Sequence, residues 1–171
     1  MKGNWLKVIR SVSGMTQQEL EIKSGVSVRT ITRIENGEIP RLSTLKQLGK
    51  VLENECGDIC ILKEMRDGHE LLNTLCGRHQ MAFNHADFKQ NEQNELIESV
   101  HSYVQEVDMV WEEVDNQSRF KWGEDMSRMM EESEKLGIVW FGMAYAASDN
   151  QSWETGYLYA VELDDESITR K

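Results

Sequence analysis

The sequence predicts an α+β protein with an all-α N-terminal domain followed by a small α+β C-terminal domain. Three observations support this expectation. Short helical patterns follow one another closely up to residue 54, longer helical patterns lie at 91–107 and 118–136, and residues 138–146 at the start of the last stretch, 138–163, are rich in strand formers. Within the last stretch, 138–146 and 153–163 flank a polar turn and are expected to form an antiparallel hairpin.

The net charge changes sign along the chain. Residues 1–54 contain nine Lys/Arg and five Asp/Glu, a net charge of +4, whereas residues 55–171 contain ten and twenty-five, a net charge of −15. Such a reversal marks two regions with different partners. The first region can approach phosphate groups, and the second would be repelled by them, so we do not expect it to lie on nucleic acid.

The same patterns predict the domain organisation. We expect a domain at 1–54, a connecting segment at 55–78 and an acidic α+β domain at 79–171. Within the connecting segment, residues 58–62 fit either a short strand or the start of a helix, and residues 69–76 fit a helix.

Compartment and redox state follow from the composition. No apolar run reaches the roughly 18 residues of a transmembrane helix, and the N-terminus lacks the apolar core of a signal peptide. We therefore expect a cytoplasmic protein without a membrane partner, whose three cysteines are reduced thiols.

Residues 15–37 predict two short helices joined by a tight turn. Thr16 can cap the first helix, and Glu19, three residues later, completes a capping box. Gly25 suits the left-handed conformation that ends a helix, and Ser27 can cap the next one. The second helix is apolar on one side and polar and basic on the other: Val28, Ile31 and Ile34 against Arg29, Thr30, Thr32 and Arg33. Proteins that recognise base pairs in the DNA major groove use a helix of this kind, held at a fixed angle by a preceding helix.

Two further helices are expected around this pair, at 4–13 and 42–53. The first places apolar residues on one face, and the second has leucines at helical spacing after Pro40. Four or five short helices in about 55 residues can enclose one small core.

These features resemble the helix-turn-helix domain of the lambda-repressor/Cro family, also called the XRE family. The resemblance covers about a third of the chain and rests on three motifs: Met15-Thr16-Gln17, Gly25-Val26-Ser27 and Ile34-Glu35-Asn36-Gly37. It implies that residues at and near the start of the second helix contact bases: Ser27, Val28, Arg29, Thr32 and Arg33. It implies phosphate contacts around the ends of the pair: Thr16, Gln17 and Asn36. The C-terminal half is only weakly similar to those of other XRE-family regulators, which implies no activity.

The resemblance also implies an ion pair between Arg10 and Glu35, which would fix geometry more than it adds stability. One position departs from the family pattern. Glu21 stands where the family usually has alanine or another small residue, at a close crossing of two helices. We expect either a wider crossing or an outward Glu21 that pairs with a nearby cation.

Three other groups of residues have a chemical and a structural interpretation. Four residues could bind zinc, but their spacing differs from the common C-x2-C type, and buried free cysteines are ordinary, so we expect no metal site: Cys56, Cys60, Cys76 and His79. The histidines lie in no motif that supports catalysis, and we expect no enzymatic activity and no cofactor. The tryptophans of the second half could fill its core, line a ligand pocket or form a dimer seam: Trp111, Trp122, Trp140 and Trp153.

We therefore expect a transcriptional regulator of repressor type that binds a roughly palindromic operator in double-stranded DNA as a homodimer. Its C-terminal domain would dimerise or bind a protein partner or a small-molecule effector. The alternative is an antitoxin-like or anti-regulator protein whose acidic C-terminal domain binds a protein partner. A stoichiometric partner would favour the alternative, and a dimer with salt-sensitive operator binding would favour the regulator.

Overall fold

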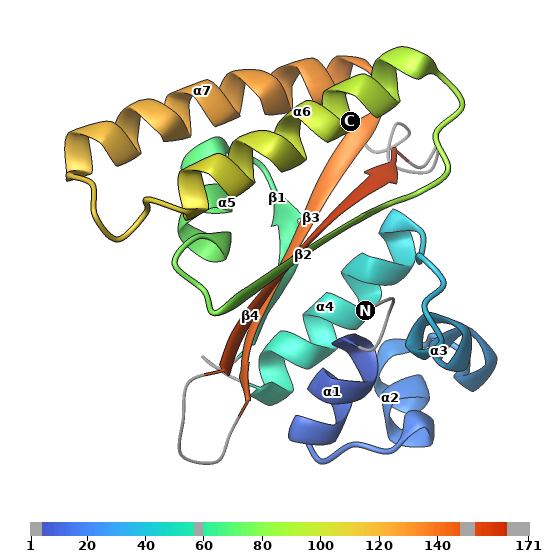
Figure 1. Cartoon of the computed structure of the whole chain (residues 1–171). Helices are drawn as coiled ribbons and strands as arrows, with labels where there is room; N and C mark the ends of the chain where they lie inside the picture. Colours follow the sequence, from blue (N-terminus) through green and yellow to red (C-terminus); the bar gives the residue numbers. More distant parts are fainter. Residues whose placement is uncertain (1–4, 57–59, 148–152, 164–171) are drawn as a thin grey trace.

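The computed structural model describes residues 5–56, 60–147 and 153–163. Within these residues the helices and strands form an α+β fold, which confirms the fold class that the sequence predicts (Figure 1). Four helices come first: α1 (Trp5–Val12), α2 (Gln17–Ser24), α3 (Val28–Glu35) and α4 (Leu42–Cys56). The remaining elements are β1 (Cys60–Met65), α5 (Gly68–Leu75), β2 (Gln80–His85), α6 (Asn91–Asp108), α7 (Asn116–Lys135), β3 (Ile138–Ala147) and β4 (Trp153–Glu162).

Local signals in the sequence account for several helix ends. Asp67 caps α5 by accepting a hydrogen bond from the Glu70 amide at 2.8 Å, and Asp115 caps α7 in the same way through the Ser118 amide at 2.7 Å. After α7 the chain turns at Gly137, whose φ of 71° is in the left-handed region. Hydrogen bonds from the Ser118 and Gln117 amides also hold the pKa of Asp115 below its usual range.

The four strands form one mixed sheet in the order β1-β3-β4-β2. β3 and β4 are the antiparallel hairpin expected near the end of the chain, with Gly142 opposite Leu158. β1 runs antiparallel to β3 on one side, and β2 runs parallel to β4 on the other. The two edges of the sheet are therefore β1 and β2.

The segment expected to connect the domains, 55–78, contributes structure of its own. It contains the edge strand β1. Of the strand and the helix start expected for residues 58–62, the structure therefore has the strand at residues 60–62, which are the ones it describes. It also contains α5, whose leucines are buried beneath α6 and α7: Leu71, Leu72 and Leu75. Each element is too short to give a clear periodic pattern, and both are held by contacts with residues far away in the chain.

The sheet separates two layers of helices. Its first face packs against the N-terminal helices, where Leu62, Phe141 and Tyr159 share one core with residues of α1 to α4. The rings of Trp5 on α1 and Tyr159 on β4 meet edge to face at 6.2 Å. The second face packs against α5, α6 and α7 (Figure 1). The four N-terminal helices are thus bound to the sheet through a continuous apolar core.

The tryptophans of the second half lie mainly in the second core. Trp111 and Trp140 are buried there, and Trp122 packs against it half-buried. The side chain of Trp153 lies outside the described residues. None of the helices in the described part of the chain is both long and apolar enough to cross a membrane.

α4 approaches the sheet closely at Gly49. A Cβ atom at this position would overlap the carbonyl oxygen of Leu62 in β1. Beside it, Glu53 of α4 accepts a hydrogen bond from the Leu62 amide at 3.2 Å. Only glycine allows α4 to lie this close to the strand.

We predict that Gly49→Ala destabilises the protein by about 1–3 kcal/mol, because the added methyl group pushes α4 away from β1. Replacing a glycine inside a helix by alanine normally stabilises a protein, since Ala is favoured there by about 0.5–1 kcal/mol. Denaturant unfolding followed by circular dichroism measures the difference. The control is Lys50→Ala, on the exposed side of α4, and a stabilising Gly49→Ala would show that the contact has no such role.

Candidate nucleic-acid interface

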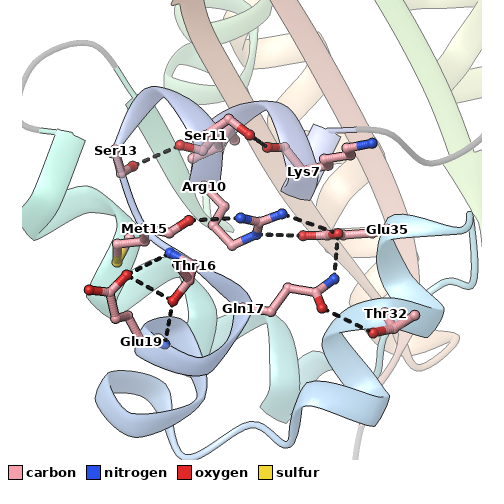
Figure 2. Close-up of polar contacts among 11 residues, drawn as sticks. Lys7, Arg10, Ser11, Ser13, Met15, Thr16, Gln17, Glu19, Thr32 and Glu35 are labelled. Carbon is pink, nitrogen blue, oxygen red and sulfur yellow. Dashed lines mark hydrogen bonds and ion pairs between the residues drawn. The ribbon is translucent and has the colours of Figure 1, made fainter.

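The helix pair α2–α3 is built by local capping. The Thr16 hydroxyl accepts from the Glu19 amide at 3.2 Å, and the Glu19 carboxylate accepts from the Thr16 amide at 2.7 Å (Figure 2). The Thr16 amide, together with the Thr16 hydroxyl that donates to the same carboxylate at 2.8 Å, holds the pKa of Glu19 below its usual range. Gly25 ends α2 with a φ of 73°, and the Ser27 hydroxyl caps α3 through the Thr30 amide at 3.3 Å. The two helices therefore begin and end where the sequence pattern predicts.

The exposure of α3 follows its periodicity. Ile31 and Ile34 are buried against the other N-terminal helices, and Val28 is half-buried. The outward side is a row of exposed polar residues, called the α3 face below: Ser27, Arg29, Thr32, Arg33 and Asn36. Four of the five residues expected to contact bases lie on this face, and the fifth, Val28, is half-buried. Asn36, which is expected to contact phosphate, lies on the same face.

A network of polar side chains holds α3 against α1 and α2. Arg10 on α1 pairs with Glu35 at the end of α3, with Nε 2.7 Å from Oε1. The Arg10 guanidinium also donates to the carbonyl oxygen of Met15 at 2.7 Å. The side chains of Arg10 and Glu35 are only 13% and 7% exposed. A nearly buried pair with several hydrogen bonds restricts the angle between the helices (Figure 2).

Gln17 belongs to the same network. Its side-chain amide donates to Glu35 at 2.8 Å, and its oxygen lies 3.5 Å from the Thr32 hydroxyl (Figure 2). The side chain expected to contact phosphate is therefore engaged within the protein. The Thr16 hydroxyl takes up the Glu19 amide, whereas the main-chain N–H groups of Gln17 and Gln18 have no partner inside the helix and remain suited to bind phosphate.

The two arginines of the α3 face differ in their surroundings. Arg33 is paired with Glu38, with Nε and Nη2 each 2.5 Å from a carboxylate oxygen. Both side chains of that pair are exposed, at 58% and 46%. Arg29 is exposed and pairs with none of the residues that the structure describes. Arg29 can thus reach a ligand directly, whereas Arg33 must first leave Glu38.

Glu21 takes a role that neither sequence expectation covered. Its carboxylate accepts a hydrogen bond from the main-chain amide of Val28 at 3.0 Å, at the first turn of α3. It is half-buried and its bond is to an amide, so it neither turns outward nor pairs with a cation there. Negative charge at a helix N-terminus is favourable because the free N–H groups and the helix dipole point toward it. Glu21 therefore works as a second cap on α3, beside Ser27.

The acidic part of the chain lies on the other side of the sheet. α6 contains five Asp/Glu residues and no Lys or Arg, and it packs on the sheet face opposite to α1–α4 (Figure 1). A ligand with phosphate groups can thus approach the α3 face without meeting α6.

The residues considered for metal binding are not gathered in the described part of the chain. No cluster of three or more His, Cys, Asp or Glu suited to a metal occurs among those residues, and the side chains of Cys56 and Cys60 lie outside them. Cys76 is buried at the end of α5, and burial, with a smaller effect of Asp108, raises the pKa of its thiol to about 12.

One histidine of the second half has a clear structural environment. The His101 ring of α6 lies against Phe83 and Trp140, with ring centroids at 4.6 and 5.8 Å. Burial, and to a smaller extent the nearby His85, lowers the pKa of His101 to about 4. It is therefore a neutral ring at neutral pH.

A hollow of about 470 Å³ opens where α4, β1, β3 and α7 meet. Its walls combine charged and apolar side chains, among them Lys46, Glu64 and Arg66 together with Met130 and Trp140. Because α4 belongs to the N-terminal helices and the other elements do not, this hollow lies at the junction of the two layers.

The contrast between the two ion pairs gives a test. We predict that Glu35→Ala destabilises the protein by about 3 kcal/mol, because it leaves the Arg10 guanidinium nearly buried and without its carboxylate. Glu38→Ala removes a carboxylate from an exposed pair and should change stability by less than about 1 kcal/mol. Denaturant unfolding of both variants measures the two effects, and equal losses would contradict the structural role given to Arg10 and Glu35.

Comparison with known proteins agrees with this geometry. Residues 13–57, which contain α2, α3 and α4, match the family model described as helix-turn-helix. No curated protein and no solved structure shows a significant match to the chain. Residues 13–57 therefore form a helix-turn-helix domain, which supports the resemblance to XRE-family regulators.

Proposed function

We propose that this DNA-binding transcriptional regulator acts in the cytoplasm, recognises a roughly palindromic operator as a homodimer, and represses transcription there. The observation that supports it best is the α3 face. It presents two arginines and three short polar side chains in one exposed row, on a helix whose angle is held by the Arg10–Glu35 pair. Side chains of this kind on such a helix suit the edges of bases in the major groove.

Each residue of the α3 face has a role that its chemistry supports. Arg29 and Arg33 can each donate two hydrogen bonds to one guanine, and Ser27 and Thr32 can bond to several bases. Val28, half-buried beside them, can touch a thymine methyl group. Asn36 and the main-chain amides that follow the Thr16 cap, those of Gln17 and Gln18, can bind phosphates and set the register on the duplex.

The test of these roles is alanine substitution of the two arginines. We predict that Arg29→Ala and Arg33→Ala each weaken binding to the operator by about 5- to 150-fold, the value of one bidentate contact to guanine. An operator selected from a pool of random duplexes supplies the ligand, and fluorescence anisotropy measures the affinity. Lys50→Ala, on the exposed side of α4, controls for the loss of one positive charge.

A further variant separates Arg33 from its partner. Glu38→Gln should strengthen operator binding, because it releases the Arg33 guanidinium and removes a negative charge near the phosphates. Thermal unfolding of every variant checks that folding survives. If operator affinity is unchanged in both arginine variants, the assignment of the α3 face is wrong.

The alternative function is that of an antitoxin-like or anti-regulator protein. It is supported by α6, whose acidic side chains lie on the sheet face away from the α3 face and are exposed: Glu92, Glu95, Glu98 and Glu106. A basic protein partner could bind there while α3 occupies DNA. This function requires a stoichiometric partner that is lost when these four residues are changed to glutamine, and a chain that purifies without such a partner and binds its operator alone argues against it.

A further inference from the structure

The two edge strands of the sheet differ in how far other elements cover them. At the β1 edge, α4 lies close against the strand, and the Leu62 amide is already bonded to Glu53. At the other edge, β2 pairs with β4 only. β2 therefore has one side that no other described strand covers.

The hydrogen bonds around β2 show which main-chain groups point outward. The Ala86 amide, just after the strand, donates to the carbonyl oxygen of Ala160 in β4 at 2.9 Å. Because main-chain groups alternate along a strand, the N–H and C=O groups of Met81 and Phe83 point away from β4. The next outward amide, that of His85, is bonded to the Asn84 side chain at 3.0 Å. In the described part of the chain, nothing bonds to the outward groups of Met81 and Phe83.

The sequence of β2 lacks the devices that usually protect an open edge. Natural edge strands carry lysine, proline or a bulge that prevents pairing with another chain. β2 reads Gln-Met-Ala-Phe-Asn-His and contains no Asp, Glu, Lys, Arg or Pro, in a chain of which 29% of residues are charged. Each copy has a net charge of −11, so two copies repel each other, and an edge without charged side chains is a surface on which this repulsion is weaker.

We propose that β2 pairs antiparallel with β2 of a second copy, which joins the two four-stranded sheets into one sheet of eight strands. The free groups fix the register, with Ala82 opposite Ala82 of the second copy. Met81 then lies opposite Phe83, and the two residues exchange main-chain hydrogen bonds on both sides of the symmetry axis. The same register places Gln80 opposite Asn84, so apolar residues face apolar ones and amides face amides.

This pairing suits a protein that reads a palindrome. The two-fold axis of an antiparallel strand pair is perpendicular to the sheet, so the helices that cover one face remain on that face in both copies. Seven strand spacings of about 4.8 Å separate the two β1 strands, roughly 34 Å. α4 packs on β1, so the two helix-turn-helix domains lie about one turn of DNA apart, close to the 34–36 Å between half-sites. The link to DNA rests on the proposed function, whereas the strand pairing does not.

The test places charges at the symmetry axis. Ala82 is half-buried on the sheet face opposite to Met81 and Phe83, and a Lys there meets its own copy across the axis. We expect the wild-type chain to be a dimer at micromolar concentration in sedimentation equilibrium. Ala82→Lys and Ala82→Glu should each raise the dimer dissociation constant at least about tenfold, because like charges directly opposite are destabilising. An equal mixture of the two variants should dimerise again.

The restored dimer of the mixture shows that both variants fold, and Gln117→Lys, exposed on α7, controls for the added charge. A monomeric wild-type chain overturns the proposal, as does a dimer that Ala82→Lys and Ala82→Glu leave intact. A β2-paired dimer that selects no operator would leave the pairing standing and remove the proposed function. Operator binding by a chain that stays monomeric would overturn the strand pairing and leave the DNA binding of the proposed function standing.

Discussion

Both faces of the four-stranded sheet must be covered, and this constraint determines how the whole molecule is arranged. The residues on the first face, among them Phe141 and Tyr159, are almost fully buried although α5–α7 cover only the second face. The helix-turn-helix domain supplies the missing cover through α1 and α4. A domain that is often joined by a free linker is here one layer of a three-layer structure. The orientation of α3 relative to the sheet is therefore set by a packed core.

This arrangement joins recognition to assembly. If the sheet is the element that dimerises, the distance between two recognition helices is set by strand spacing and by the contact of α4 with β1. Gly49 matters in this respect because its missing Cβ lets α4 lie directly on the strand. The layering also places the acidic α6 on the far side of the sheet from the α3 face, so the basic side chains of α3 do not lie beside α6 although the chain has a net charge of −11.

Within the helix-turn-helix domain, charged residues serve two separate purposes. Arg10 and Glu35 are nearly buried and bonded to each other and to neighbouring groups, so they hold geometry. Arg33 and Glu38 are exposed, and water and salt weaken their attraction. An exposed pair of this kind costs little to break. Arg29 has no such partner in the described structure and is the most direct candidate to contact a base.

The sequence by itself determined the features that depend on neighbouring residues. Thr16, Glu19, Gly25 and Ser27 fix helix ends through contacts within a few positions, and the spacing of Ile31 and Ile34 predicted the inner side of α3. The family motifs added DNA binding, and the matching family model supports it. The long helices and the late hairpin were also predicted, because their patterns extend over many residues.

Only the tertiary structure decided which distant groups meet. It showed that Gln17 bonds to Glu35, that Arg33 is held by Glu38, and that Glu21 caps α3. It also showed that residues 55–78 supply an edge strand and a core helix, and that the N-terminal helices cover the sheet. These outcomes depend on contacts between residues far apart in the chain. Several partners would suit each side chain or strand edge equally well, and a single sequence does not indicate which of them it will contact.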